Sequence, residues 1–446
     1  MPRMTFRGGV HPPSRKSETW NLPITAAPLP EKVILPLEHS SEFHYRLLVE
    51  LGDQVRTGQS VAEAEKPTPF VCHASVSGRI TSIGPCPDVS GRNVRSITIE
   101  SDGHDRWHRH PSPPGDPSIL SAPELLERIR DAGVAGTGDD GRPAYLKLSR
   151  CMNQKNRIVL LNGMESEPFL AGEHRMLVES TAEILTGLRI WMQTLGVRRA
   201  KIAVPREDRE AIRKLHKTLG RAKTISVVPL DSKYPMGSEF QLVEALTGLK
   251  ASPAKLGADC GIFTETVATA LATAEAVMAR KPFVERVVTV AGDGVREPRN
   301  LKVRIGTPIR ELVACCGGFT SDRIRLIVGG PMTGPSVHSD RIPVTKNTCG
   351  ILAFAVTGLP AVSEKPCISC GRCWDCCPMR LSPRKIEHWI LHGRSERALS
   401  AGLDACILCG SCGYVCPSKR KLTSRIAEEK ASQSAKKARS PRQDGA

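Results

Sequence analysis

The chain has 446 residues, of which 40% are apolar, 24% charged and 4% aromatic, and its net charge is +17. A chain of this length is too long to fold around a single hydrophobic core, so we expect three or four domains. No stretch reaches the ~18 apolar residues of a membrane helix, and the N-terminus lacks the apolar core of a signal peptide. We therefore expect a cytoplasmic protein that attaches to a membrane only peripherally.

The positive charge favours an anionic partner. Nucleic acid is not expected, because the basic residues are spread out and few aromatic side chains are available to stack on bases. An acidic electron carrier and an anionic lipid surface fit equally well.

Residues 1 to about 30 are rich in proline and predict an extended arm. Short β-like runs and turns follow from 31 to about 101, in a pattern that resembles the hammerhead of biotinyl and lipoyl domains, a small β sandwich. Those domains carry their cofactor on a lysine at a hairpin tip, and Lys66 lies near that place. The adjacent Pro67 and the absence of the usual tip pattern argue against a modified lysine here.

After a linker at 102–118, helical and strand patterns alternate, which predicts an α/β domain with a largely parallel sheet. From 285 to 330 a hairpin pattern precedes a helix, with Thr307 as its N-cap and Pro308 at its first position. This favours a small β-grasp-like unit. The basic tail from 429 cannot bury a core, so we expect disorder there, with contact to anionic lipid as the alternative to a merely solvated tail.

Nine of the sixteen cysteines fall between residues 367 and 416. In a reducing compartment they are not expected to form disulfides, and the other seven are expected to be small buried hydrophobes. The clustered cysteines form two runs of C-x2-C-x2-C-x3-C-P. Zinc is the alternative, but zinc sites usually join two separated C-x2-C pairs.

When this run occurs twice, the fourth cysteine of each run binds the cluster of the other run. We therefore predict two [4Fe–4S] clusters. One is bound by Cys367, Cys370, Cys373 and Cys416, and the other by Cys406, Cys409, Cys412 and Cys377. Cys376 is extra and is expected to be a packing residue. The stretch between the runs predicts helix, with Ile386, Trp389, Ile390, Ala398 and Leu399 on apolar faces.

Several motifs, in order, resemble the RnfC family, which belongs to Rnf-type electron-transport complexes. They are "FRGGVHPPSRKSET", "KYPMGSEFQLVEALTG", "ERVVTVAGDGV", "VGGPMTG", "PVTKNTCGIL" and the twin cysteine runs. The resemblance implies a multidomain α+β protein. Its parts would be an arm and barrel-sandwich hybrid (1–115), a Rossmann-like α/β domain for FMN and NADH (116–258), a β-grasp, SLBB-like domain (259–340), a helical ferredoxin-like 2[4Fe–4S] domain (341–428) and a disordered tail (429–446).

The family likeness also implies a function. The chain would be a peripheral component on the cytoplasmic face of the membrane, taking electrons from NADH through FMN and passing them along its clusters. Its partners would be the other membrane subunits of an ion-translocating oxidoreductase complex, with ferredoxin as a further partner. Catalysis would be the hydride chemistry of the flavin, so no acid or base residue is nominated.

The flavin site of the family maps onto a glycine-rich loop and two later motifs. The matching residues are Gly136, Gly138, Gly141, Pro143, Lys147, Asn162, Glu165, Glu167, Pro168, Gly237 and Glu239. The loop departs from the family pattern at Asp139, Asp140 and Arg142, and carboxylates beside a phosphate repel it. A flavin-less iron–sulfur relay fed by ferredoxin therefore stays open. A soluble flavoprotein of the cobalamin-reductase kind also stays open, because relatives of that kind share the domain order.

Overall fold

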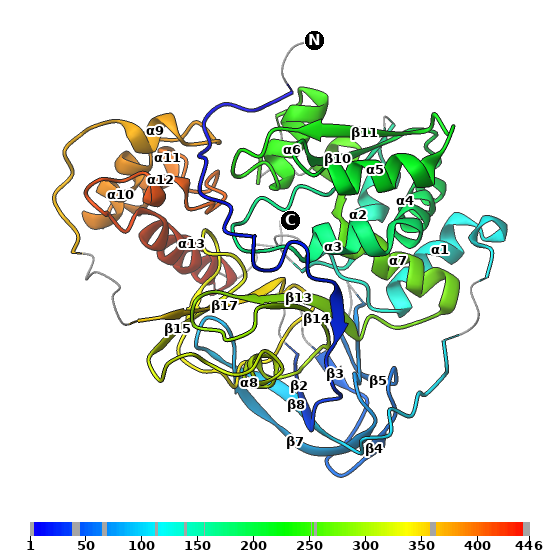
Figure 1. The fold of residues 1–446 in the computed structure, drawn as a ribbon. Coiled ribbons are helices and arrows are strands. Elements are labelled where there is room, and N and C mark those ends of the chain that lie inside the picture. Colours follow the sequence, from blue (N-terminus) through cyan, green and yellow to red (C-terminus); the bar gives the residue numbers. More distant parts are fainter. Residues whose placement is uncertain are drawn as a thin grey trace, which may run out of the picture. The chain divides into compact units, whose positions relative to one another are not determined.

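The computed structural model describes residues 4–37, 45–64, 69–111, 115–137, 141–155, 157–250, 252–253, 257–356 and 363–439. The chain forms two compact units, whose elements are labelled in Figure 1. The first, called here the sheet unit, contains residues 13–231 and 257–359. The second, called the cysteine unit, contains residues 1–12, 232–256 and 360–446, so three distant parts of the sequence meet in it.

The sheet unit begins with two small antiparallel sheets. One has the order β2 (Lys32–Pro36), β8 (Asn93–Ser101), β7 (Gly78–Pro87) and β4 (Gln54–Val55), and the other has β3 (Tyr45–Leu47), β5 (Ser60–Ala64) and β6 (Val71–His73). Alternate side chains such as Val33, Leu35, Ile97 and Ile99 point into the core, as expected for strands with one buried face. The predicted β sandwich is present, while Lys66 lies outside the described residues.

A four-stranded sheet of the order β11 (Ile225–Leu230), β10 (Ala200–Pro205), β9 (Ile158–Asn162) and β12 (Ile262–Thr266) follows. Every pairing in it is parallel, which confirms the α/β prediction. Its helices are α1 (Ala122–Asp131), α2 (Ala144–Met152), α3 (Gly172–Glu179), α4 (Thr181–Leu195), α5 (Arg209–Leu219) and α7 (Val267–Ala279), with 3₁₀ turns at Pro117–Ile119 and Gly257–Cys260. Helix α4 packs closely on α7, because Gly187 leaves room for the carbonyl of Ala270.

The third sheet has the order β1 (Ile24–Ala26), β14 (Arg299–Arg304), β13 (Glu285–Ala291), β17 (Gly350–Ala355), β15 (Ile324–Val328) and β16 (Ser336–Val337). The predicted hairpin is β13–β14, and helix α8 (Ile309–Ala314) follows it. Three expectations were wrong in detail. The α/β domain does not end at residue 258, because β12 pairs with β9 in the parallel sheet. Helix α8 is capped by Pro308, because the Thr307 hydroxyl donates to the carbonyl of Arg304 instead (2.8 Å). A domain boundary after residue 340 would cut β17 from the sheet that binds it on both sides.

The cysteine unit is helical and contains α6 (Glu239–Thr247), α9 (Arg372–Asp375), α10 (Pro383–Leu391), α11 (Ser395–Ser400), α12 (Ser411–Tyr414) and α13 (Leu422–Arg439). The last five are drawn in orange and red in Figure 1. Ile386, Ala398, Leu403 and Ile426 form a small core. The helical stretch expected between the cysteine runs is divided into α10 and α11 at Gly393, whose φ of 63° ends the first helix.

Helix α13 corrects the expectation of a disordered tail from residue 429, because it continues to Arg439. Its sequence has few apolar residues, but alanine and lysine are strong helix formers, and Gln433 donates to Glu429 one turn earlier (2.6 Å). The low hydrophobicity of the residues from 429 onward therefore argues against a buried core there, but it does not argue against a helix. Among the described residues, no helix has the length and apolar character that crossing a bilayer requires.

Candidate functional site

The two cysteine runs fold as equivalent loops. Each position of the first run recurs 39 residues later, as for Cys367 and Cys406. Short helices α9 and α12 obey the same offset and follow glycines with nearly equal φ, 77° at Gly371 and 78° at Gly410. Helices α10 and α13 also start 39 residues apart. The chain thus presents two copies of one cysteine-bearing motif.

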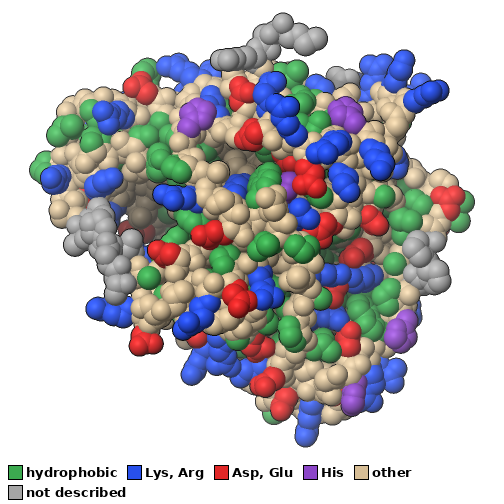
Figure 2. Space-filling view, in the orientation of Figure 1, with side chains coloured by type: hydrophobic (Ala, Val, Ile, Leu, Met, Phe, Trp, Pro, Cys, Tyr) green, Lys and Arg blue, Asp and Glu red, His purple; other side chains and the backbone are tan. Residues whose placement is uncertain are grey.

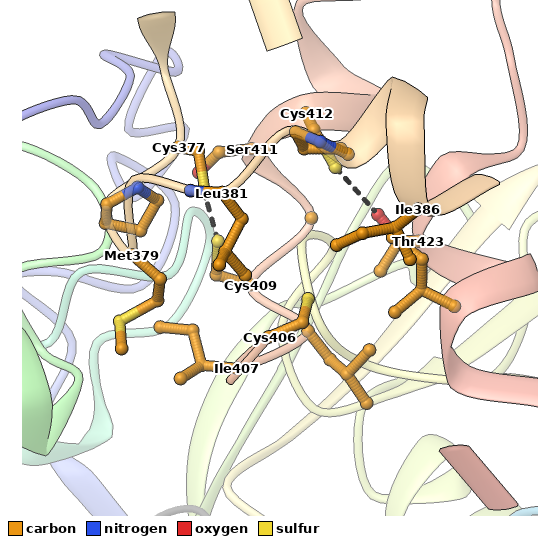
Figure 3. A pocket seen from close by; sticks show the side chains of 15 residues that line it. Cys377, Met379, Leu381, Ile386, Cys406, Ile407, Cys409, Ser411, Cys412 and Thr423 are labelled. Atoms are coloured by element: carbon orange, nitrogen blue, oxygen red, sulfur yellow. Dashed lines mark hydrogen bonds between the residues drawn. The ribbon is translucent and has the colours of Figure 1, made fainter. Parts of the chain in front are cut away.

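Four cysteines from both runs line one pocket, which we call the Cys406 pocket (Figure 3). They are Cys406, Cys409 and Cys412 from the second run and Cys377 from the first. The remaining lining is largely apolar and includes Met379, Leu381, Ile386, Ile407, Leu408 and Ile426. The structure therefore brings together the second set of four cysteines predicted from the spacing.

The other four line a second pocket, called here the Cys367 pocket. Cys367, Cys370 and Cys373 come from the first run and Cys416 from the second. This lining is more polar and contains Arg372, Arg384, Glu387 and Arg420. Cys367 and Cys370 are exposed, so this pocket opens to solvent.

Backbone N–H groups point at the sulfur atoms in both pockets. Ser369 donates to Cys367 (3.4 Å), Leu381 to Cys377 (3.3 Å) and Arg420 to Cys416 (3.5 Å). The Thr423 hydroxyl lies 3.7 Å from the sulfur of Cys412. Such donors stabilise thiolates, whereas the pKa of Cys406 is raised to about 11, chiefly by burial. A bound metal would have to offset this burial to keep the sulfur deprotonated.

The pockets fit an iron–sulfur cubane, in which each iron takes one cysteine. Four thiols surround each pocket with small backbone loops between them. A zinc ion instead needs its ligands about 2.3 Å from one point. Within the described part of the chain, no three His, Cys, Asp or Glu side chains are gathered in that way.

Cys376 lines neither pocket. It is 6% exposed, and its sulfur donates to the carbonyl of Cys373 (3.5 Å). These contacts are those of a packing residue.

Two segments that are distant in the sequence contact the cysteine loops around the Cys406 pocket. The sequence did not predict either contact. The Gly9 N–H donates to the carbonyl of Cys376 (2.8 Å), and a Cβ on Gly8 would lie 2.8 Å from the carbonyls of Cys376 and Cys377. The Tyr234 hydroxyl donates to the carbonyl of Cys409 (2.7 Å). Their only sequence signal was membership of two quoted motifs, "FRGG" and "KYPMGSE".

The described residues of the glycine loop form hydrogen bonds with other residues of the sheet unit. The Gly136 N–H donates to the carbonyl of Arg142 (2.7 Å) and the Thr137 N–H to the Thr269 hydroxyl (3.0 Å). A Cβ on Gly136 would lie 2.9 Å from the carboxylate of Glu265. The same carboxylate pairs with Lys147 (3.4 Å), which also donates to the carbonyl of Thr264 (2.6 Å). An FMN phosphate at Lys147 would therefore have to displace Glu265, a residue the motif comparison did not single out.

The polar side chains of the second flavin motif also accept hydrogen bonds from other residues of the chain. Asn162 accepts from the N–H of Met164 (3.1 Å). Glu165 accepts from the N–H groups of Glu173 and His174 at the start of α3 (3.2 and 3.3 Å). Glu167 accepts from the Met332 N–H (3.0 Å) and the Thr333 hydroxyl (2.6 Å).

The remaining flavin candidates are placed as follows. Gly141 adopts a φ of 62° just before α2, and Pro143 is the N-cap of that helix. Gly237 and Glu239 belong to the cysteine unit, where Glu239 begins α6. Gly138, Asp139 and Asp140 lie outside the described residues.

Three protein families match consecutive parts of this chain. Residues 4–104 match the RnfC barrel sandwich hybrid domain, 129–275 the Nuo51 FMN-binding domain and 287–336 the SLBB domain. The domain order expected from the motifs is confirmed at this level.

Three curated relatives are similar to this chain over more than three quarters of their own length. The chain is 37% identical over 404 residues to the C component of the ion-translocating oxidoreductase complex of Rhodobacter capsulatus, covering 90% of this chain and 77% of that protein. It is 35% identical to the C component of the proton-translocating ferredoxin:NAD(+) oxidoreductase complex of Clostridium ljungdahlii (86% and 84% covered). It is 34% identical to the Na(+)-translocating counterpart of Acetobacterium woodii (86% and 87%).

Among solved structures, an NAD+-reducing [NiFe]-hydrogenase in the H2-reduced state aligns with a TM-score of 0.52 at 17% identity. The alignment covers 74% of this chain and 68% of that one. At this identity the likeness concerns the fold alone.

Proposed function

The chain belongs to the RnfC family of ion-translocating oxidoreductase complexes, and from this premise we propose that it conducts electrons within such a complex. Two [4Fe–4S] clusters would be held in a helical, ferredoxin-like domain. One would be bound by Cys367, Cys370, Cys373 and Cys416, and the other by Cys377, Cys406, Cys409 and Cys412. When bound, each cluster accepts and releases one electron.

The observation that carries this proposal is the mixed origin of both pockets, each with three thiols from one run and one from the other. Exchange of the fourth cysteine ties the two loops together. The chain's own residues then hold the thiolates with N–H donors, and the apolar side chains of the Cys406 pocket keep water away from it.

We place the family's NADH and FMN chemistry in the domain at 129–275, which matches an FMN-binding family. Lys147, Asn162, Glu165 and the glycine loop would hold the flavin, after release of Lys147 from Glu265. The relatives from Clostridium ljungdahlii and Acetobacterium woodii are named as parts of ferredoxin:NAD(+) oxidoreductase complexes. We therefore propose NADH and ferredoxin as the redox partners of the complex.

The position of the chain in the complex is part of the same proposal. It would lie on the cytoplasmic face of the membrane, bound to the other subunits. Its domains would be those expected from the motifs, with two boundaries moved. The α/β domain would extend through β12 and α7, because β12 pairs with β9. The boundary after the third sheet would follow β17, because β17 belongs to that sheet.

A flavin-less relay is the second candidate, and one contact favours it. Glu265 neutralises Lys147 and lies against Gly136, where the family resemblance requires an anionic phosphate. In that case electrons would reach the thiolate-bound clusters directly from another protein.

Anaerobic purification of the full chain tests both candidates. We expect about eight iron and eight sulfide per chain for two [4Fe–4S] clusters. Bound FMN and bleaching of the iron–sulfur absorbance by NADH would support the first candidate, whereas full clusters without either would support the second. A single zinc ion, or thiols that take up no iron after reconstitution, would overturn the proposal.

A further inference from the structure

Large apolar side chains are exposed beside the Cys367 pocket. Ile368 is 66% exposed and Trp374 is 49% exposed, and both line that pocket. Ile368 stands between the exposed Cys367 and Cys370 in the sequence. Exposed apolar residues are common singly, but an isoleucine and a tryptophan at one redox site are typical anchors of a protein interface.

The charges around these anchors are mostly positive. Four charged residues line the pocket, three arginines (Arg372, Arg384 and Arg420) and one glutamate (Glu387). Glu387 is buried and bonded to Arg420 (2.9 Å) and Arg425, so Glu387 and Arg420 largely neutralise each other and the positive charge of the lining lies on Arg372 and Arg384. The guanidinium of Arg7 lies 5.2 Å from the ring centre of Trp374 and adds to the basic rim. Asp375 is the one exposed carboxylate of α9.

Figure 2 shows one face of the molecule, on which Lys and Arg side chains lie among Asp and Glu side chains and gather in several places. The Cys406 pocket, for comparison, has no charged residue in its lining. Of the two thiol-lined pockets, the Cys367 pocket alone combines exposure, apolar anchors and basic charge.

We propose that Ile368, Trp374, Arg372 and Arg384 form the docking surface for a separate electron-transfer protein that presents an acidic face around its redox group. This inference rests on the proposed function, because it requires a cluster bound by Cys367, Cys370, Cys373 and Cys416. In the transfer the partner loses one electron and that cluster gains one, with no proton moved and no bond broken. Complementary charge would speed the encounter, and the two apolar side chains would hold the complex together.

Stopped-flow oxidation of a reduced acidic bacterial ferredoxin by the full-length, cluster-loaded chain tests this surface. The double variants Arg372→Glu/Arg384→Glu and Ile368→Ser/Trp374→Ala alter charge and anchors separately. The control is Leu249→Ser/Lys250→Glu, which changes an exposed leucine (51%) and an exposed lysine that line neither pocket. Iron, sulfide and electron paramagnetic resonance spectra are measured first for each protein.

We expect the wild-type rate constant to fall steeply as salt is added, because the attraction is screened. The charge variant should be at least tenfold slower at low salt and lose this dependence. The anchor variant should be at least fivefold slower and keep it, while the control stays within twofold of wild type.

Docking variants that match the control, or a wild-type rate that does not depend on salt, would overturn the docking surface and leave the clusters in place. A wild-type chain without iron or sulfide would instead remove the proposed function itself. The two failures are therefore distinguishable.

Discussion

Cys376 and Cys377 are neighbours in the sequence, yet only Cys377 lines the Cys406 pocket. Its sulfur accepts from the Leu381 N–H (3.3 Å), whereas that of Cys376 donates to a backbone carbonyl. The two side chains therefore allow a matched comparison of ligand and packing residue.

We predict that Cys377→Ser loses one cluster, and with it about half of the iron of a two-cluster chain. Cys376→Ser removes only a packing sulfur and should keep nearly all of it. Iron and sulfide analysis with electron paramagnetic resonance measures both. Equal iron loss in the two variants would contradict the ligand assignment.

Glu265 and Lys147 decide how well the flavin-like domain can accept a phosphate. Their 3.4 Å ion pair is mostly buried, and it competes with any anion for the same ammonium group. Glu265→Gln should remove the competing charge and tighten FMN binding by about tenfold, which corresponds to roughly 1.4 kcal/mol. Fluorescence quenching of added FMN measures the affinity.

Glu275→Gln is the matched control, because Glu275 lies on the neighbouring helix α7 and pairs with Lys281 instead (3.1 Å). It should leave the FMN affinity unchanged. A Glu265→Gln variant that binds FMN no better than the control would show that this ion pair does not limit the site.

Single residues were predictable from the sequence where their partners lie nearby. The cysteine grouping follows from spacings of two or three residues and from the repetition of the run. Glu265, Tyr234 and Gly8 were not predictable, because their contacts join residues that only the tertiary fold brings together.

At the scale of elements, the first turn of helix α3 contains Glu173, whose titration should change the stability of the protein with pH. The pKa of Glu173 is raised to about 8, first by loss of hydration and then by the nearby Glu165, while Arg286, Thr266 and Lys16 act against this. The folded chain thus keeps a proton that the unfolded chain releases near pH 4.5.

The contribution of Glu173 to the free energy of unfolding should therefore be fully present below about pH 4.5 and should decline as the pH rises to about 8. Glu173→Gln keeps a neutral side chain and should flatten the decline, which amounts to up to about 5 kcal/mol by pH 8 for this shift in pKa. Urea unfolding of both proteins at pH 5, 6, 7 and 8, with Glu183→Gln on α4 as control, measures this. A wild type that gains stability over this range relative to Glu173→Gln would contradict the prediction.

The N-terminal arm is an element without regular structure that contacts the turn before Cys377. Gly8→Ala would place a methyl group 2.8 Å from two carbonyls of this turn, at a φ of 76°. We expect the cluster bound by Cys377 to be lost at least fivefold faster on exposure to air, as followed by iron–sulfur absorbance.

Gly393→Ala separates backbone strain from contact. It has a comparable φ of 63° and nothing within 4 Å of its Cβ position. Its cluster lifetime should match that of wild type. If both alanine variants decay alike, strain rather than the arm contact sets the lifetime.

Elements were predicted well where a periodic pattern is supported by neighbouring strands and helices. The parallel sheet and the β13–β14 hairpin are present as expected. The errors concern ends and weakly apolar segments. The start of α8 depended on whether the Thr307 hydroxyl caps it. Helix α13 continues to Arg439 because Leu422 and Ile426 are buried in its first turns and its later residues favour helix.

At the scale of the whole chain, whose net charge is +17, the two thiol-lined pockets differ in the charged residues that line them. Three arginines line the Cys367 pocket and none lines the Cys406 pocket. Adding an electron adds negative charge, which nearby cations and water stabilise and an apolar lining does not. The two clusters should therefore have different reduction potentials, with the Cys367 pocket higher.

A redox titration followed by electron paramagnetic resonance should resolve two one-electron steps. Arg384→Gln should lower the potential of the higher step by tens of millivolts, where about 59 mV corresponds to a tenfold change in equilibrium constant for one electron. The lower step should stay unchanged, because Arg384 does not line the Cys406 pocket. Arg397→Gln on α11, which lines neither pocket, is the control. If Arg384→Gln moves both steps equally or moves the lower one alone, the polar lining does not set the order of the two potentials.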